Sequence, residues 1–207
     1  MAKRSSITLT LIRCGETTWE SQQRVHGVTD LPLSDAGRAA VTADLNLLRD
    51  LKIGFIHHPP DEAATDTAKI CAPVLSAKLR EAPELNDPNL GLLEGLTEKA
   101  FADRFRSRHK QWEENPITLS PPEGEDMTTA AARIYRGLAK LIRRSRNEEI
   151  AVVMHDLGRA MIRCWVADRP LTAMRDMEGG PGVERIVVPL AMLDRLETAA
   201  DAPAPVK

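Results

Sequence analysis

The chain has 207 residues and a formal net charge of −2, with 43% hydrophobic and 28% charged residues. This is ordinary globular composition, and the near-neutral charge gives no reason to expect a nucleic-acid partner. No stretch approaches the ~18 uninterrupted apolar residues of a membrane span, and the short apolar run near the start is not a secretory signal. The three cysteines form no CxxC pair, so neither a disulfide framework nor a zinc site is expected. We therefore expect a cytoplasmic protein that binds no metal and no cofactor.

Strand and helix patterns alternate along the first 80 residues. The sequence predicts a buried strand over 7–12, a helix over about 34–51 with Ser34 as its N-cap, a short strand over 52–57 and a helix over 61–79. This β-α-β-α order predicts a parallel sheet that is flanked by helices.

The rest of the chain also alternates between predicted helices and strands, but with longer loops between them. The pattern predicts a loop over 81–95, a charged helix over 97–112, a proline-rich loop over 116–124, a strong helix over 127–146, a buried strand over 149–154, a helix to about 167 and a last strand over 183–188. We expect one domain over 1–198 and a disordered tail over 199–207.

Two predicted strands end in charged turns. Arg13-Cys14-Gly15 follows the first strand, and His155-Asp156 follows the strand over 149–154. Because parallel strands share their carboxyl edge, we expect Cys14 and His155 to face one another. Such a pair is a possible nucleophilic couple, since a neighbouring cation favours the reactive thiolate. The alternative is that Cys14 is a small buried thiol at a strand end.

The spacing around the cysteines excludes one class of enzyme. Thiol-based phosphatases need an arginine six residues after the nucleophile. The residues six positions after Cys14, Cys71 and Cys164 are Glu20, Ala77 and Pro170. None is an arginine, so a thiol phosphatase is excluded.

The first turn lies in a longer motif. Leu-Ile-Arg-Cys-Gly-Glu-Thr-Thr-Trp over 11–19, followed by Leu-Pro-Leu-Ser over 31–34, resembles the signature of the histidine phosphatase superfamily (phosphoglycerate mutase-like), which reads Arg-His-Gly-Glu-Thr/Ser. The segments over 85–96, 122–125 and 152–155 also resemble that family, in the right order. The resemblance covers roughly residues 7–188. It implies a three-layer α/β/α sandwich with a mostly parallel central sheet.

The resemblance also implies roles for individual residues. In this family two histidines and two arginines surround the transferred phosphoryl group, and an acid protonates the leaving oxygen. Arg13 stands at the first arginine, His155 at the second histidine and Asp87 at the acid. His26 stands at a position on the rim of the substrate pocket.

Other positions depart from the family pattern. Cys14 replaces the nucleophilic histidine, and the second arginine is matched by Glu62 or Ala63, depending on the end from which the segment over 57–68 is counted. A phosphate-contacting asparagine is matched by Glu20, and a glycine by Asp156. A like charge ~4 Å away costs roughly 4 kcal/mol at an effective dielectric of 20. The attraction that is lost with the arginine and the repulsion that a glutamate adds in its place are two contributions of this size. Together they equal the ~8 kcal/mol that corresponds to micromolar binding.

These departures predict a catalytically impaired member of the family, which acts by binding a small phosphorylated molecule or a protein partner. The alternative is an active phosphomonoester phosphatase that uses Cys14 or His155 as its nucleophile. A third interpretation makes Cys14 a redox-responsive thiol. The oligomeric state stays open, with a homodimer as the default for soluble oligomers.

Overall fold

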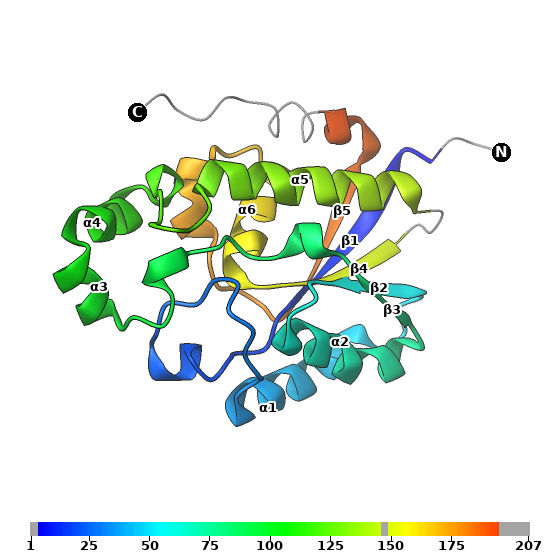
Figure 1. The fold of residues 1–207 in the computed structure, drawn as a ribbon. Coiled ribbons are helices and arrows are strands. Elements are labelled where there is room, and N and C mark those ends of the chain that lie inside the picture. The colour runs from blue at the N-terminus through cyan, green and yellow to red at the C-terminus, as the bar shows by residue number, and fades with distance from the viewer. Residues whose placement is uncertain (1–3, 146–148, 195–207) are drawn as a thin grey trace.

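The computed structural model describes residues 4–145 and 149–194, which form a five-stranded sheet between two layers of helices (Figure 1). The strands are β1 (Ser6–Arg13), β2 (Phe55–His58), β3 (Lys78–Glu81), β4 (Glu149–Met154) and β5 (Val183–Pro189), in the spatial order β3-β2-β4-β1-β5. The first four run parallel, and β5 pairs antiparallel with β1 at one edge. The predicted mostly parallel α/β/α sandwich is confirmed.

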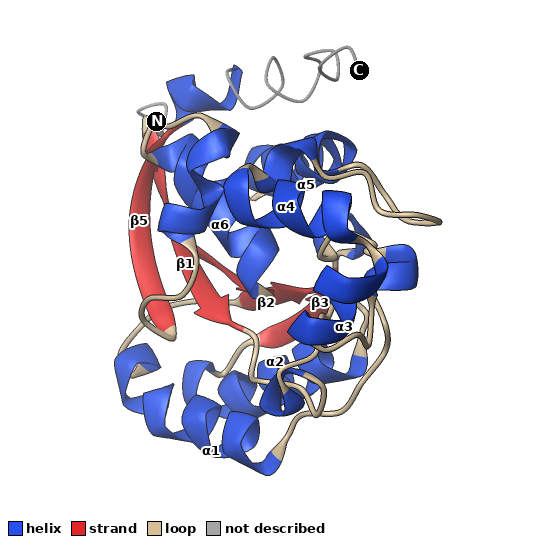
Figure 2. Ribbon diagram, turned by 90° about the vertical axis from the view of Figure 1, so that its left-hand side faces the viewer, coloured by secondary structure: helices blue, strands red, loops and turns tan. Residues whose placement is uncertain are grey.

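The helices divide between the two faces of the sheet. The helices α1 (Asp35–Asp44) and α2 (Glu62–Leu75) cover one face, while α5 (Met127–Arg144) and α6 (Asp156–Val166) cover the other (Figure 2). The helices α3 (Glu98–Arg104) and α4 (Arg106–Glu114) extend beyond the sheet on the side of its carboxyl edge. None of the helices in the described ranges is long and apolar enough to cross a membrane.

The two-residue period of the strands builds both halves of the core. Leu9 and Leu11 of β1 pack in the apolar cluster with α5 and α6, whereas Ile12 packs in the cluster with α1 and α2. In β4, Val152 and Val153 divide between the same two clusters. Strands buried on both faces read as continuous apolar runs, which is why the sequence pattern found β1 and β4.

Several predicted elements are confirmed and others need correction. The strand over 149–154, the helix α5 and the N-cap of α1 are as predicted, and the Ser34 hydroxyl accepts from the backbone N–H of Gly37 at 2.9 Å. The helix predicted over 61–79 ends at Leu75, because Ser76 adopts a left-handed conformation (φ 50°) and the chain turns into β3. β3 is an edge strand with mostly exposed residues, so it lacks an apolar signature.

Smaller differences concern three other segments. The helix predicted over 97–112 is two helices, because Phe105 leaves the helical conformation (φ −132°, ψ 48°). The helix predicted to 51 ends at Asp44 and continues as a 3₁₀ turn, and the strand predicted over 52–57 lies at Phe55–His58. The predicted loop over 81–95 contains two 3₁₀ turns, Pro83–Leu85 and Gly91–Leu93. The tail over 199–207 lies outside the described residues.

The register of the central strands brings the two charged turns together. Arg13 of β1 lies opposite Met154 of β4, so the next residues, Cys14 and His155, leave the sheet side by side. The backbone N–H of Cys14 donates to the carbonyl of Met154 at 2.8 Å. This is the carboxyl edge of a parallel sheet, where α/β proteins bind their ligands.

Candidate functional site

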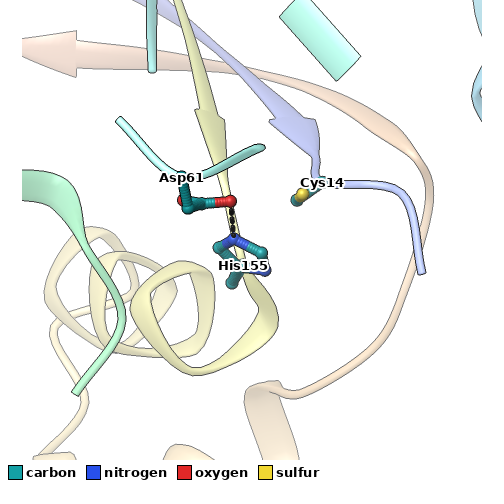
Figure 3. Close-up of side chains that lie close together, drawn as sticks. All are labelled: Cys14, Asp61 and His155. Atoms are coloured by element: carbon teal, nitrogen blue, oxygen red, sulfur yellow. Dashed lines mark hydrogen bonds and ion pairs between the residues drawn. The ribbon is translucent and has the colours of Figure 1, made fainter. Parts of the chain in front are cut away.

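Three side chains with different chemistry meet at this edge (Figure 3). Cys14 follows β1, His155 is the N-cap residue of α6, and Asp61 is the N-cap residue of α2. Their donor atoms all lie within 4.8 Å of one another. The site therefore holds a thiol, an imidazole and a carboxylate in contact, as the sequence predicted for Cys14 and His155 but not for Asp61.

The Cys14 side chain is enclosed by α2. It is 6% exposed, its sulfur lies 3.7 Å from the hydroxyl of Thr67, and the same hydroxyl accepts from the backbone N–H of Gly15 at 3.0 Å. Burial raises the pKa of the Cys14 thiol, and the neighbouring His155 opposes this shift without reversing it. A raised pKa disfavours the thiolate, which is the reactive form of the side chain, so burial makes Cys14 a poorer nucleophile.

The imidazole of His155 is paired with Asp61. Its Nε2 lies 3.1 Å from Oδ1 of Asp61, and this oxygen also accepts from the backbone N–H of Ala64 at 2.8 Å. Burial alone would lower the pKa of His155, but Cys14 and Asp61 outweigh burial and raise it well above its usual value. Burial likewise opposes ionisation of Asp61, yet the hydrogen bond with His155 brings its pKa below the usual value. The two groups form an imidazolium–carboxylate pair.

Asp87 lies on another side of His155 and is buried. Its Oδ1 accepts from the backbone N–H of Gly158 at 2.8 Å. Burial raises the pKa of Asp87 to about 6, although the charge of His155 and the Gly158 hydrogen bond both work against this rise. A carboxyl group with such a pKa can donate a proton near neutral pH, which suits the acid role that the resemblance implies.

Arg13 is engaged by an acidic partner. Its guanidinium lies 2.5 Å from Oδ2 of Asp156, while Oδ1 of Asp156 lies 3.2 Å from the buried guanidinium of Arg159. Arg159 also donates to the carbonyl of Pro181 at 2.7 Å. Asp156 therefore pairs with two guanidinium groups, those of Arg13 and Arg159, and holds Arg13 in place.

Glu20 and His26 line a cleft of about 520 Å³ that continues outward from Asp87 and Asp156. A carboxylate oxygen of Glu20 lies 4.0 Å from Nδ1 of His26 and accepts from the backbone N–H of Thr17 at 2.7 Å. The ring of His26 meets the ring of His155 edge-on at 5.2 Å. Four carboxyl groups and one guanidinium line this cleft: Glu20, Asp87, Glu98, Asp156 and Arg24.

Glu62 is not brought into the site. It is an exposed residue in the first turn of α2, and its backbone N–H donates to Asp30 at 2.6 Å. Ala63 is buried among apolar neighbours. The start of α2 thus presents Asp61 to His155, and neither position considered for the second arginine supplies a cation.

Sequence reasoning missed the residues that hold the site in place. Arg133 on α5 donates to the carbonyls of Asn86 and Asp87 at 2.8 and 3.2 Å, and so fixes the loop that carries the acid. Glu94 accepts from the backbone N–H groups of Thr29 and Leu90, which ties the loop after His26 to the loop after Asp87. Both contacts join segments far apart in the chain, and no local pattern marks them.

Asp61 did carry a local signal. Pro-Pro-Asp-Glu directly after a strand marks a helix start with Asp61 as its N-cap. The pattern predicts the cap but not the second partner of the carboxylate, because His155 lies 94 residues away in the chain.

Comparison with known proteins agrees with this architecture. A sequence profile of the histidine phosphatase superfamily (branch 1) matches residues 9–188. The chain is 25% identical over 169 residues to a "probable phosphoglycerate mutase GpmB" of Yersinia pestis, covering 80% of this chain and 77% of that protein. The alpha-ribazole phosphatase from Shigella flexneri superposes with a TM-score of 0.78 at 20% identity, covering 88% and 94% of the two chains. A mycobacterial glucosyl-3-phosphoglycerate phosphatase superposes with a TM-score of 0.75 at 22% identity, covering 88% and 89%. The chain belongs to the histidine phosphatase superfamily.

Proposed function

We propose that this chain does not transfer phosphoryl groups and instead acts by binding a ligand in the cleft lined by Glu20, His26 and Asp87. The observation that carries the proposal is the position of Asp61. Its carboxylate pairs with His155, beside Cys14, in the place where the transferred phosphate of an active family member must be surrounded by cations.

Charge supports this proposal. A phosphate dianion at Cys14 would lie close to the Asp61 carboxylate, where each like-charge pair at ~4 Å costs roughly 4 kcal/mol at an effective dielectric of 20, and only the imidazolium of His155 acts against this repulsion within the pair. Arg13, which would offset this repulsion, is engaged by Asp156. The hydrogen bond that His155 would give to a phosphate is already given to Asp61. Binding of a phosphate dianion is therefore opposed both by repulsion and by the loss of its usual donors.

The lining of the cleft favours a different ligand. Its carboxyl groups outnumber its guanidinium groups by four to one, and Asp87 and Glu20 face the same space as His26. A neutral or positively charged group, presented by a small molecule or by a segment of a protein partner, fits this lining. A phosphorylated molecule would have to keep its phosphate away from Cys14.

The alternative of an active phosphatase has one feature in its favour, the contact between Cys14 and His155. Its weakness is that burial raises the pKa of Cys14 and so disfavours the thiolate that would attack the phosphorus. His155 could serve as the nucleophile only after it gives up the proton that it shares with Asp61.

The test measures turnover and anion binding in chelator-treated protein. With an aryl phosphate we expect no release of phosphate above that of a Cys14→Ala/His155→Ala variant, against the ~1–10³ s⁻¹ of typical enzymes. With millimolar orthovanadate, a mimic of the transferred phosphoryl group, we expect no increase in Tm. Turnover at an ordinary enzymatic rate that Cys14→Ala or His155→Ala abolishes would establish the phosphatase instead. A phosphorylated protein trapped by rapid acid quench would identify its nucleophile.

A further inference from the structure

We propose that Cys14, Asp61 and His155 form a binding site for a divalent transition-metal ion of the zinc type. This inference departs from our sequence-based expectation of no metal. It rests on the proposed function in one respect, namely that no phosphate binds beside Cys14.

The spacing of the donor atoms fits a tetrahedral ion. The Cys14 sulfur, a carboxylate oxygen of Asp61 and a ring nitrogen of His155 lie within 4.8 Å of one another, and the nitrogen and oxygen are 3.1 Å apart. Two ligands at the ~2.0–2.2 Å of zinc–nitrogen and zinc–oxygen bonds lie about 3.3 Å apart in a tetrahedron. The nitrogen and the oxygen already have this spacing, and the sulfur, within 4.8 Å of both, has to move towards them to share the ion.

The chemistry of the donors selects the class of ion. Thiolate and imidazole are ligands of zinc and its neighbours, whereas magnesium and calcium prefer all-oxygen sites. A thiolate and a carboxylate neutralise the two charges of the ion. Binding releases the thiol proton of Cys14 and the proton shared by His155 and Asp61.

The ligands are held in place by their own elements. Asp61 is fixed by the backbone N–H of Ala64 at the start of α2, and Cys14 by its backbone bond to Met154 and its contact with Thr67. Fixed ligands lower the entropic cost of binding an ion. Figure 3 shows the three side chains converging from β1, the start of α2 and the start of α6.

The site has room for a fourth ligand. A cavity of about 190 Å³ is lined by both Asp61 and His155, together with Asp87, Asn86 and Gly27. It can hold a water molecule on the open side of the ion. Three protein ligands and one exchangeable position are the arrangement of zinc sites that bind a further ligand.

A second cluster in the described residues supplies an internal control. Glu98, His109 and Glu113 also lie within 4.8 Å of one another, but the glutamates are exposed and there is no thiol. We expect this cluster on α3 and α4 to hold zinc weakly at most. His109→Ala removes it without touching the proposed site.

The experiment titrates the chelator-treated full chain with Zn²⁺ against a chromogenic chelator, and in parallel with Co²⁺ while the absorption spectrum is recorded. We expect one tightly bound ion per chain and a thiolate-to-cobalt charge-transfer band in the near ultraviolet. Cys14→Ser and Asp61→Asn should each weaken zinc binding by about 100-fold or more, since even partners outside the first ligand shell contribute 10–100-fold. His109→Ala should bind as the unmodified chain does.

The variants are chosen to keep the fold. Serine matches cysteine in shape, and asparagine is itself a good N-cap residue that still accepts from Ala64. If one variant fails to fold by circular dichroism, the other still decides the result. Absence of a tight site in the unmodified chain, absence of the charge-transfer band, or loss of binding in His109→Ala alone would overturn the proposal. Each of these results leaves the phosphate assays on metal-free protein unchanged, so the two proposals fail separately.

Discussion

Two carboxyl groups, Asp61 and Asp87, lie near the same imidazole, but their pKa values are shifted in opposite directions. Both line the cavity beside His155, and burial disfavours the ionised form of each. Asp61 makes a direct hydrogen bond with His155, and its pKa lies below the usual value. Asp87 lacks that direct bond among the described contacts, and its pKa is raised to about 6. A charged group that is hydrogen-bonded directly to a buried carboxyl group lowers its pKa by more than burial raises it, whereas a more distant charge does not.

The difference assigns the two groups to different chemistry. Asp61, whose pKa is lowered, is ionised at neutral pH and is the group that our proposal holds responsible for excluding phosphate from the position beside Cys14. Asp87 changes its charge near neutral pH, as a proton donor for a leaving group must. The site thus combines a carboxyl group suited to the acid role of the family with a second carboxylate, Asp61, that is paired with His155.

The largest expected effect comes from removing Asp61. Asp61→Ala deletes the N-cap of α2 and leaves His155, which is 5% exposed, without its charged partner. Breaking a buried pair from one side costs several kcal/mol, so we expect a loss of about 4 kcal/mol in the free energy of unfolding at pH 7. Urea unfolding followed by circular dichroism measures it.

Asp61→Asn is the matched control, because it keeps the cap and removes only the charge. It should lose clearly less stability than Asp61→Ala. The contribution of Asp61 is present above its unfolded pKa and is lost as pH falls through its lowered folded pKa, while that of His155 is lost as pH rises through its raised folded pKa. The difference in the free energy of unfolding between the unmodified chain and Asp61→Asn should therefore be largest at pH values between the lowered pKa of Asp61 and the raised pKa of His155. A difference in the free energy of unfolding that does not change with pH would mean that the Asp61–His155 ion pair does not contribute to stability.

A somewhat smaller effect, of opposite sign, is expected at Asp87. The unfolded carboxyl group ionises near 3.8 and the folded one near about 6, so the unfolded state binds fewer protons between these values and ionisation destabilises the fold as pH rises. Asp87→Asn keeps an oxygen for the Gly158 N–H and removes this penalty. It should become more stable than the unmodified chain by up to about 3 kcal/mol, because each tenfold change in an ionisation constant corresponds to about 1.36 kcal/mol.

The measurement is the free energy of unfolding of both chains at pH 4, 5, 6 and 8. The advantage of Asp87→Asn should be small at pH 4, grow towards pH 6 and level off above it. An advantage that is the same at pH 4 and pH 8, or that is absent at pH 8, would show that burial does not control the charge of Asp87.

The smallest effect is expected at Glu62, which the sequence placed among the binding residues and the structure places at the surface. Glu62→Ala should change the free energy of unfolding by no more than about 0.5 kcal/mol, as exposed substitutions usually do. It should also leave the response to orthovanadate unchanged. A Tm increase with orthovanadate in Glu62→Ala alone would mean that this carboxylate, rather than Asp61, excludes phosphate.

The sequence by itself determined four strands of the sheet, the family and the meeting of Cys14 with His155. These inferences succeed because apolar periodicity reports buried strands, and because residues that follow parallel strands must share one edge. It also located Asp87 and its loop by resemblance. Edge strand β3 escaped detection, since its exposed residues carry no apolar pattern.

Only the tertiary structure decided which acid faces His155. Asp61 and Glu62 are neighbours in the chain, and either could have supplied the charge beside Cys14. The N-cap conformation of Asp61 directs its carboxylate back over the start of α2, towards both Ala64 and His155, whereas Glu62 lies in the first turn on the exposed side. The directions in which the side chains of Asp61 and Glu62 point depend on how the start of α2 packs against the end of β4. That packing brings together residues that are 94 positions apart in the chain.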